Sequence, residues 1–334
     1  MERKKGIRYF VAAIAVLLMV GVAEWTGEKE IIFPELMALT IGGWIIDKRV
    51  WKVKWWQTVL LMSLGAVIGV CIVRYSSFPF PVNLALAFAF AGLCLLCSRA
   101  TLIPLISACM LPVLLGTETW IYPLSVSLLS LVIVVGQGGL EKSNVRHKID
   151  YVPADRNWKS DAFRWLSLLL FVYLLAVVAY RMGYRYLIIP PLVVMFTEIV
   201  TSKAGFRARP TQLFLFMMTA SLLGTGFQII GHHYLHLPET VVALCIILCL
   251  FAIFEWTGKY FAPAGALAFI PMIVPSENLV WLPLQASIGA VVLIVIAMIF
   301  FLQCYKWSRA QLVYCVTPTL LRRYLDRKRK QVNI

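Results

Sequence analysis

The chain has 334 residues, of which 61% are hydrophobic and 14% are charged, and its formal net charge is +15. Soluble domains carry about 25% charged residues, so this composition excludes a soluble protein and indicates a polytopic membrane protein. The positive charge does not indicate nucleic-acid binding, because no aromatic side chains alternate with the basic ones on a soluble face. A lipid bilayer with anionic headgroups is the partner that we expect for the basic residues, and not a nucleic acid.

Twelve apolar segments are candidate membrane helices, six in each half of the chain. In the first half they lie near 7–23, 31–46, 57–73, 83–97, 101–116 and 121–137. In the second half they lie near 165–180, 187–202, 212–230, 240–254, 260–275 and 281–302. The chain thus divides into a first membrane repeat (1–137), a cytoplasmic linker (138–164), a second membrane repeat (165–303) and an amphipathic, polybasic cytoplasmic tail (304–334).

The two halves share a pattern of prolines and acids. Pro104, Pro112, Glu118 and Pro123 recur as Pro263, Pro271, Glu277 and Pro283, at an offset that drifts only from about 156 to 160 residues. Six segments per copy is an even number, so both copies have the same orientation. The sequence therefore predicts an all-α membrane protein of two parallel repeats, a plan that transporters use with a site between the repeats.

The basic residues predict which side of the membrane each loop faces. If the N-terminus is cytoplasmic and all twelve segments cross, 27 of the 31 Lys and Arg residues lie on the cytoplasmic side. This is the asymmetry of the positive-inside rule. We expect a multi-pass protein of a bacterial cytoplasmic (inner) membrane with both termini in the cytoplasm.

Prolines mark the second and fifth segments of each copy as candidate parts of a solute site. Short, proline-broken segments at matching positions of two repeats are typical of transport sites. The fifth segments are short, and either spanning or re-entrant paths fit them. The residues that we expect to line the site are Pro104, Ser107, Pro263, Gly265 and Ala266, with Arg99 and Lys259 at its cytoplasmic mouth. The alternatives are a packing kink for the prolines and membrane anchoring for the two cations.

Two acids lie within apolar segments, where a charge is costly unless it faces a partner or a pore. Glu35 and Glu198 are therefore candidates to carry a coupled proton. His232 and His236 have a spacing that suits a metal on a helix, but nothing nearby completes a ligand set, and we expect an ordinary loop there. The tetrapeptide Glu-Trp-Thr-Gly occurs at 24–27 and at 255–258. Because the two copies occupy different repeat positions, we attribute their identity to chance and to the preference of Trp for membrane interfaces.

One stretch resembles a known family. Pro263-Ala264-Gly265-Ala266, followed by Trp281-Leu282-Pro283-Leu284 and a long apolar segment, is similar to the HPP family of integral membrane proteins. That family is named for a His-Pro-Pro motif followed by Ala-Gly-Ala; Phe261 and Ala262 stand here in place of His-Pro. The order of segments resembles two fused HPP-like units. Some plant and cyanobacterial members are associated with nitrite transport, so the resemblance implies movement of a small anion.

The sequence leaves three functional hypotheses. The first is a permease for a small anionic or polar solute, without ATP hydrolysis of its own, since no nucleotide-binding motif is present. The second is a membrane subunit that does not transport and docks a partner through its basic linker and tail. The third is an enzyme acting on lipid-linked substrates, which we disfavour because no Asp, His or Ser cluster suggests catalysis. We expect no cofactor and no metal, and the sequence is also compatible with a homo-oligomer.

Overall fold

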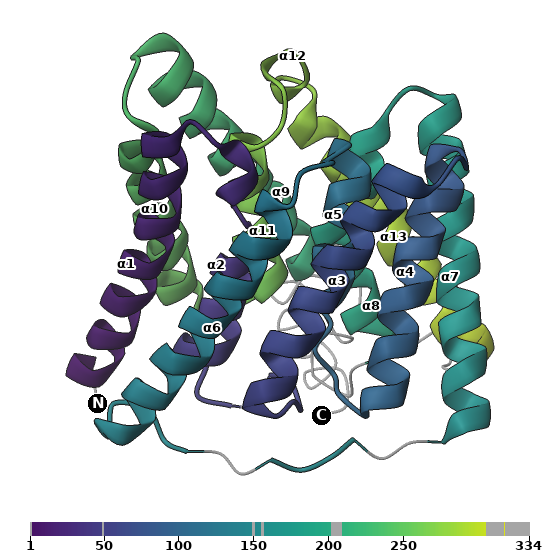
Figure 1. Ribbon diagram of the computed structural model, residues 1–334, viewed down its shortest axis with the longest axis horizontal. Coiled ribbons are helices and arrows are strands. Elements are labelled where there is room, and N and C mark those ends of the chain that lie inside the picture. The colour runs from purple at the N-terminus through teal and green to yellow at the C-terminus, as the bar shows by residue number, and fades with distance from the viewer. Residues whose placement is uncertain are drawn as a thin grey trace, which may run out of the picture.

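The computed structural model describes residues 2–48, 50–148, 151–154, 157–201, 209–304 and 317. Within these ranges the protein is helical and contains no strand (Figure 1). Its long helices are α1 (Glu2–Thr26), α3 (Trp55–Tyr75), α4 (Phe80–Ser98), α6 (Ile121–Lys142), α7 (Trp158–Arg181), α9 (Pro210–Phe227, continued as a π-helix to Tyr234), α10 (Glu239–Thr257) and α13 (Leu282–Cys304). All eight are long and apolar enough to cross a bilayer, which confirms the prediction of an all-α, polytopic membrane protein.

Four further apolar helices are short. They are α2 (Glu35–Thr40, continued as a π-helix through Ile45), α5 (Leu105–Leu115), α8 (Pro190–Thr201) and α11 (Ala262–Phe269, continued as a 3₁₀ turn through Met272). At 1.5 Å per residue each reaches only about 15 Å, roughly half of the hydrocarbon thickness. The fifth segment of each half is thus short, as expected. The second segment of each half is short as well, which the apolar pattern did not predict.

Proline sets where each short helix begins. Pro34 and Pro104 directly precede α2 and α5, Pro190 and Pro191 open α8, and Pro263 lies in the first turn of α11. Proline suits the first turn because its missing N–H would have no helical partner there, and it disfavours continuation of a helix through the residues before it. Each short helix therefore starts inside the protein instead of at its surface.

The short helices form the centre of the bundle and the long helices surround them. All six residues of α2 and all eight of α11 are buried, whereas only 33–44% of each long apolar stretch is buried. Two glycines allow the surrounding helices to approach closely. A Cβ on Gly69 of α3 would lie 2.5 Å from the carbonyl oxygen of Cys109 in α5, and one on Gly224 of α9 would lie 2.1 Å from that of Ala268 in α11. Any larger residue would push these helices apart.

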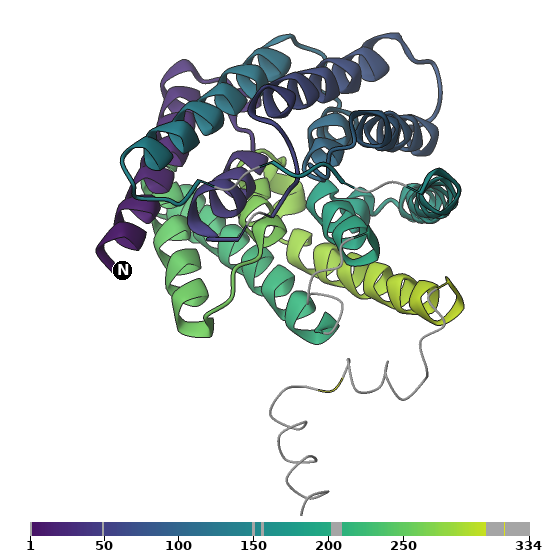
Figure 2. The same ribbon diagram turned by 90° about the horizontal axis from the view of Figure 1, so that it is seen from below.

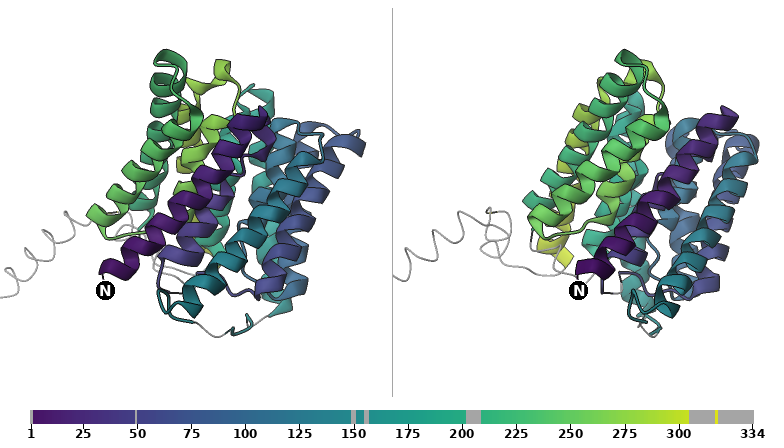
Figure 3. Two further views of the ribbon diagram at one scale, coloured as in Figure 1. Left: turned by 60° about the vertical axis from the view of Figure 1, so that its left-hand side comes forward. Right: turned by 90° about the vertical axis from the view of Figure 1, so that its left-hand side faces the viewer.

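The two halves of the chain interlock. Helix α1 packs against α10, α4 against α7, α2 against α11 and α5 against α8, and each of these pairs joins the first half to the second. Figures 2 and 3 show the halves side by side, with α1 lying along α10. The N-terminus of α1 and the connection from α6 to α7 lie at the same end of the bundle, at the bottom of Figure 1. We refer to this end as the linker end and to the opposite one as the far end.

The two Glu-Trp-Thr-Gly tetrapeptides have the same local structure at opposite ends of the antiparallel pair α1–α10. Each Thr hydroxyl donates to carbonyls three and four residues back, each Gly adopts a positive φ that ends the helix, and each Trp is more than 85% exposed. Glu24 accepts hydrogen bonds from the first N–H groups of α10, and Glu255 pairs with Lys5 of α1 at 2.7 Å. The tetrapeptides therefore share more than the interfacial preference of Trp.

The boundaries of the polar regions differ from those expected. Helix α6 continues to Lys142 and α7 begins at Trp158, so both helices extend into the predicted linker 138–164. Apolar runs define only the membrane-buried part of a helix, and a polar continuation beyond it carries no apolar signal. The predicted tail, 304–334, lies outside the described residues except for its first residue and residue 317.

Candidate functional site

The N-terminal turns of the four short helices surround one small cavity, which we name the central chamber. Its volume is about 10 Å³, close to the space that one water molecule needs. Residues from α2, α5, α8 and α11 line it, together with one side chain from the segment before α3: Glu35, Ala38, Trp51, Pro104, Ser107, Pro191, Val194, Glu198, Ala262, Pro263 and Ala266. The chamber is thus built from both halves of the chain.

Glu35 is the first residue of α2 and is only 1% exposed. One of its carboxylate oxygens, Oε1, accepts a hydrogen bond from the hydroxyl of Ser107 in α5. The other, Oε2, is buried and has no hydrogen-bond partner among the residues that the structure describes. A buried polar atom without a partner costs about 1–3 kcal/mol, so this oxygen marks a place where the chamber can bind something.

Glu198 is the second buried acid, 6% exposed and located near the end of α8. Its Oε1 accepts a hydrogen bond of 3.1 Å from the indole Nε1 of Trp51. Trp51 lies between the π-helix at 41–45 and α3. Glu35 and Glu198 therefore reach the same chamber from opposite halves, although they do not occupy equivalent positions of the two sequence copies.

Six of the nine residues proposed from the sequence line the central chamber, and these are Glu35, Pro104, Ser107, Glu198, Pro263 and Ala266. The other three lie elsewhere. Gly265 faces α2, where a Cβ would lie 2.4 Å from the side chain of Ile41. Arg99 is exposed at the end of α4, and Lys259 donates a hydrogen bond of 2.8 Å to Gln212 of α9. The chamber is therefore acidic, and the two cations expected at its mouth do not line it.

A second, larger cavity opens toward the linker end, and we name it the vestibule. Its volume is about 730 Å³, within the range of small-molecule sites. Lys54, Lys142, Arg146 and Lys148 are its cations and Glu141 is its only acid among the described residues. Its aromatic side chains are Trp51, Trp55, Trp56 and Tyr151. The cavity therefore combines a net positive charge with flat apolar walls.

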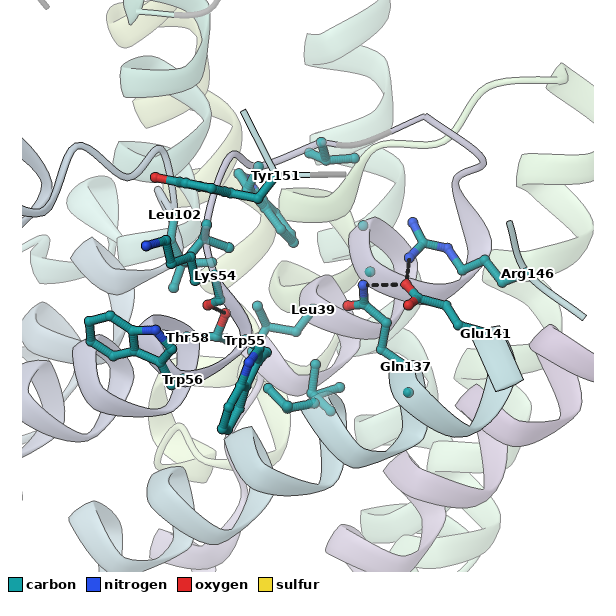
Figure 4. Close-up of a pocket in the computed structure, with 18 of the residues that line it drawn as sticks. Leu39, Lys54, Trp55, Trp56, Thr58, Leu102, Gln137, Glu141, Arg146 and Tyr151 are labelled. Atoms are coloured by element: carbon teal, nitrogen blue, oxygen red, sulfur yellow. Dashed lines mark hydrogen bonds and ion pairs between the residues drawn. The ribbon is translucent and has the colours of Figure 1, made fainter. Parts of the chain in front are cut away.

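The buried part of the vestibule is held by a polar network (Figure 4). Gln137 donates to Glu141 at 2.9 Å, and Arg146 lies 3.7 Å from the same carboxylate and donates to the carbonyl of Ile46. Because Arg146 offsets the charge of Glu141, the lysines determine the charge of the cavity. On the opposite wall the ammonium of Lys54 lies 5.4 Å from the centre of the Tyr151 ring.

Trp51, Gln137 and Arg146 are residues of these cavities that the sequence reasoning missed. The basic residues near them were interpreted only as topology signals. The available signal was the density of tryptophan in Trp51-Lys52-Val53-Lys54-Trp55-Trp56, which is high for a short connection between two helices. Within the described ranges, His, Cys, Asp and Glu side chains form no group of three that could hold a metal ion.

Comparison with known proteins gives no relative: no protein-family model, no curated protein and no solved structure matches the chain.

Proposed function

We propose that the protein is a membrane transporter that moves a small polar or anionic solute through the central chamber, without hydrolysing ATP itself. One observation carries this proposal. A small cavity lies where four short, proline-initiated helices meet among long apolar helices, and two buried carboxyl groups line it. Broken helices with a site at their ends are a recurrent way to build a solute site within a membrane.

The arrangement of helices supports two repeats of the same orientation. From α1 to α6 the order is long, short, long, long, short, long, and α7 to α13 follow the same order apart from the one-turn α12 (Ser276–Leu279). The close contacts of Gly69 on α5 and Gly224 on α11 also correspond, at an offset of 155 residues. In such a protein the two halves are related by an axis along the membrane normal, and the chamber lies where they meet.

Backbone groups make the chamber suitable for an anion. The N-terminal end of a helix carries a partial positive charge, and α5, α8 and α11 each turn this end toward the chamber. The first N–H groups of α5 and α8 already donate to carbonyls of the residues before them, so it is the dipole of these two helices that favours an anion. The acids then serve as proton carriers. When Oε2 of Glu35 is protonated, its O–H can donate a hydrogen bond to an anion. A proton and an anion bound together add no net charge to a buried site, which lowers the cost of burying either alone.

Nitrite is the first solute to test, because the resemblance to the HPP family favours a small anion. The basic residues around the vestibule support a cytoplasmic position for the linker end, in line with the positive-inside rule. The solute would then pass between the chamber and the cytoplasm through the vestibule.

Uptake into liposomes that contain the purified protein tests the proposal. The panel is nitrite, nitrate, formate and chloride, measured for the wild type, for the double variant Glu35→Gln/Glu198→Gln and for Arg99→Gln/Lys259→Gln. We expect saturable uptake of at least one anion that the first variant loses and the second retains. Loss of uptake in the Arg99→Gln/Lys259→Gln variant alone would instead support a solute site at Arg99 and Lys259. Absence of saturable uptake of every anion by folded wild-type protein would contradict transport of a small anion.

The docking hypothesis rests on the linker and the tail. The tail lies almost wholly outside the described residues, so the docking hypothesis stays a prediction. Transport is the function that the geometry of the central chamber supports best.

A further inference from the structure

One side chain separates the central chamber from the vestibule. Trp51 belongs to the lining of both cavities, with the acids of the chamber on one side and the lysines of the vestibule on the other. It is 7% exposed, so its indole fills the space between them. No other residue lines both cavities within the described part of the chain.

Two contacts hold the indole in this position. Its Nε1 donates to Oε1 of Glu198 at 3.1 Å. The six-membered ring of the indole packs against Gly42 of the π-helix, so closely that a Cβ on Gly42 would be 2.4 Å from its Cη2. The first contact depends on the state of a carboxyl group, because a proton or a solute on that oxygen competes with the indole N–H for it. The second requires a residue without a side chain.

The backbone that carries Trp51 is suited to local movement. Residues 46–48 and 50–54 form no helix, and hydrogen bonds at Lys52 tie this part of the chain to Thr101, before α5. A rotation of the indole about its own side-chain bonds leaves these backbone bonds intact. The vestibule, with a volume of about 730 Å³, offers space beside the indole into which the ring can turn.

We propose that the indole of Trp51 is the gate between the vestibule and the central chamber, and that Glu198 holds it closed. This inference rests on the proposed function and deepens it. The lysines of the vestibule concentrate small anions at the gate, as clefts lined by one sign of charge do for oppositely charged solutes. Protonation of Glu198 or binding of the solute releases the indole, and the chamber then opens toward the linker end.

Chemical labelling of the chamber acids tests the gate without any transported solute. The probe is a water-soluble carbodiimide with glycine ethyl ester, and peptide mass spectrometry measures modification of Glu35 relative to that of exposed Glu118. We expect Trp51→Ala to raise the relative labelling of Glu35 about tenfold or more. Trp55→Ala is the matched control, because Trp55 lines the vestibule but not the chamber; its labelling should equal that of the wild type.

A second variant guards against a folding defect in Trp51→Ala. Gly42→Ala places a methyl group where the ring lies and should displace the indole while leaving Trp51 in the chain. The same increase in both variants, at unchanged thermal stability, is the expected result. Labelling of Glu35 that stays at the wild-type level in folded Trp51→Ala or Gly42→Ala protein would overturn the proposal. Because labelling requires no uptake, failure of the gate and failure of the transport function are distinguishable.

Discussion

The central chamber and the vestibule are neighbours with opposite properties. The chamber has a volume of about 10 Å³ and the vestibule one of about 730 Å³. Among the residues that the structure describes, two buried acids line the chamber, whereas four cations and one acid line the vestibule. A basic cavity attracts an anion but does not by itself select or couple it. A small cavity lined by two buried acids disfavours a bare anion and favours one that arrives together with a proton. In the proposed transporter, the vestibule would therefore attract the solute and the chamber would couple its movement to a proton.

We expect the largest effect on uptake from substitution of an acid in the central chamber. Glu35→Gln removes the group that can exchange a proton, and we expect anion uptake to fall by about a hundredfold, equivalent to about 2.7 kcal/mol. Glu35→Asp keeps a carboxyl group one methylene shorter and should retain a measurable part of the uptake. Initial rates in liposomes at equal protein content check both variants. Equal rates in the wild type and Glu35→Gln would show that the chamber acid is not used.

The hydrogen bond within the chamber should have a smaller effect. Ser107→Ala removes the donor to Glu35, which costs about 1–2 kcal/mol, and uptake should fall about tenfold. Ser127→Ala is the matched control, because the Ser127 hydroxyl donates to a carbonyl of its own helix. If both variants transport alike, the position of the Glu35 carboxyl group does not depend on Ser107.

Changes to the basic cavity should alter affinity more than maximal rate. We expect Lys54→Gln/Lys142→Gln to raise the KM for the anion about two- to fivefold and to leave kcat unchanged, because exposed cations act by attraction. Salt should reduce the difference, since the Debye length is only about 8 Å at physiological ionic strength. Lys4→Gln, at the same end of the bundle but outside the vestibule, is the control. A fall in kcat would instead indicate that these lysines act on movement of the solute through the central chamber.

The smallest effect on transport is expected far from both cavities. Glu24→Ala removes the acceptor for the first N–H groups of α10, and the free energy of unfolding should fall by about 1 kcal/mol, as for other helix caps. Uptake per folded molecule should stay unchanged, and thermal unfolding in detergent measures the loss of stability. A loss of transport without a loss of stability would link the α1–α10 contact to the transport cycle.

Much of the fold follows from local features of the sequence. The lengths of the apolar stretches indicated the membrane segments. The prolines at 104 and 263 indicated two short helices, because proline acts on the backbone next to it. The shortness of α2 and α8 was missed: an apolar stretch does not reveal whether its first residues are helical or extended. The paired tetrapeptides were noted but attributed to chance and to the interfacial preference of Trp, because the contacts of their acids exist only once α1 and α10 lie antiparallel.

The candidate site was predictable only in part. Glu35 and Glu198 were recognisable, since an acid in an apolar segment is costly without a role. The place of Trp51 between two cavities depends on its packing against Gly42, nine positions earlier in the chain. No hydrophobic pattern in the sequence indicates that these two residues touch. Arg99 and Lys259 were expected to approach one site because their positions correspond in the two copies. Neither residue lines the chamber, since each follows a long helix and precedes the stretch that leads to a short one, and their place at its cytoplasmic mouth stays a prediction.

Proton movement that accompanies the anion tests the central claim most directly. Liposomes loaded with a pH-sensitive dye would report protons that enter when nitrite, or whichever anion the panel identifies, is added outside. The wild type should carry protons inward with the anion, and an inward proton gradient should accelerate its uptake. Glu35→Gln should show neither effect, while Glu118→Gln behaves as the wild type. Anion uptake by the wild type without proton movement, or an equal gradient response in Glu35→Gln, would contradict the account.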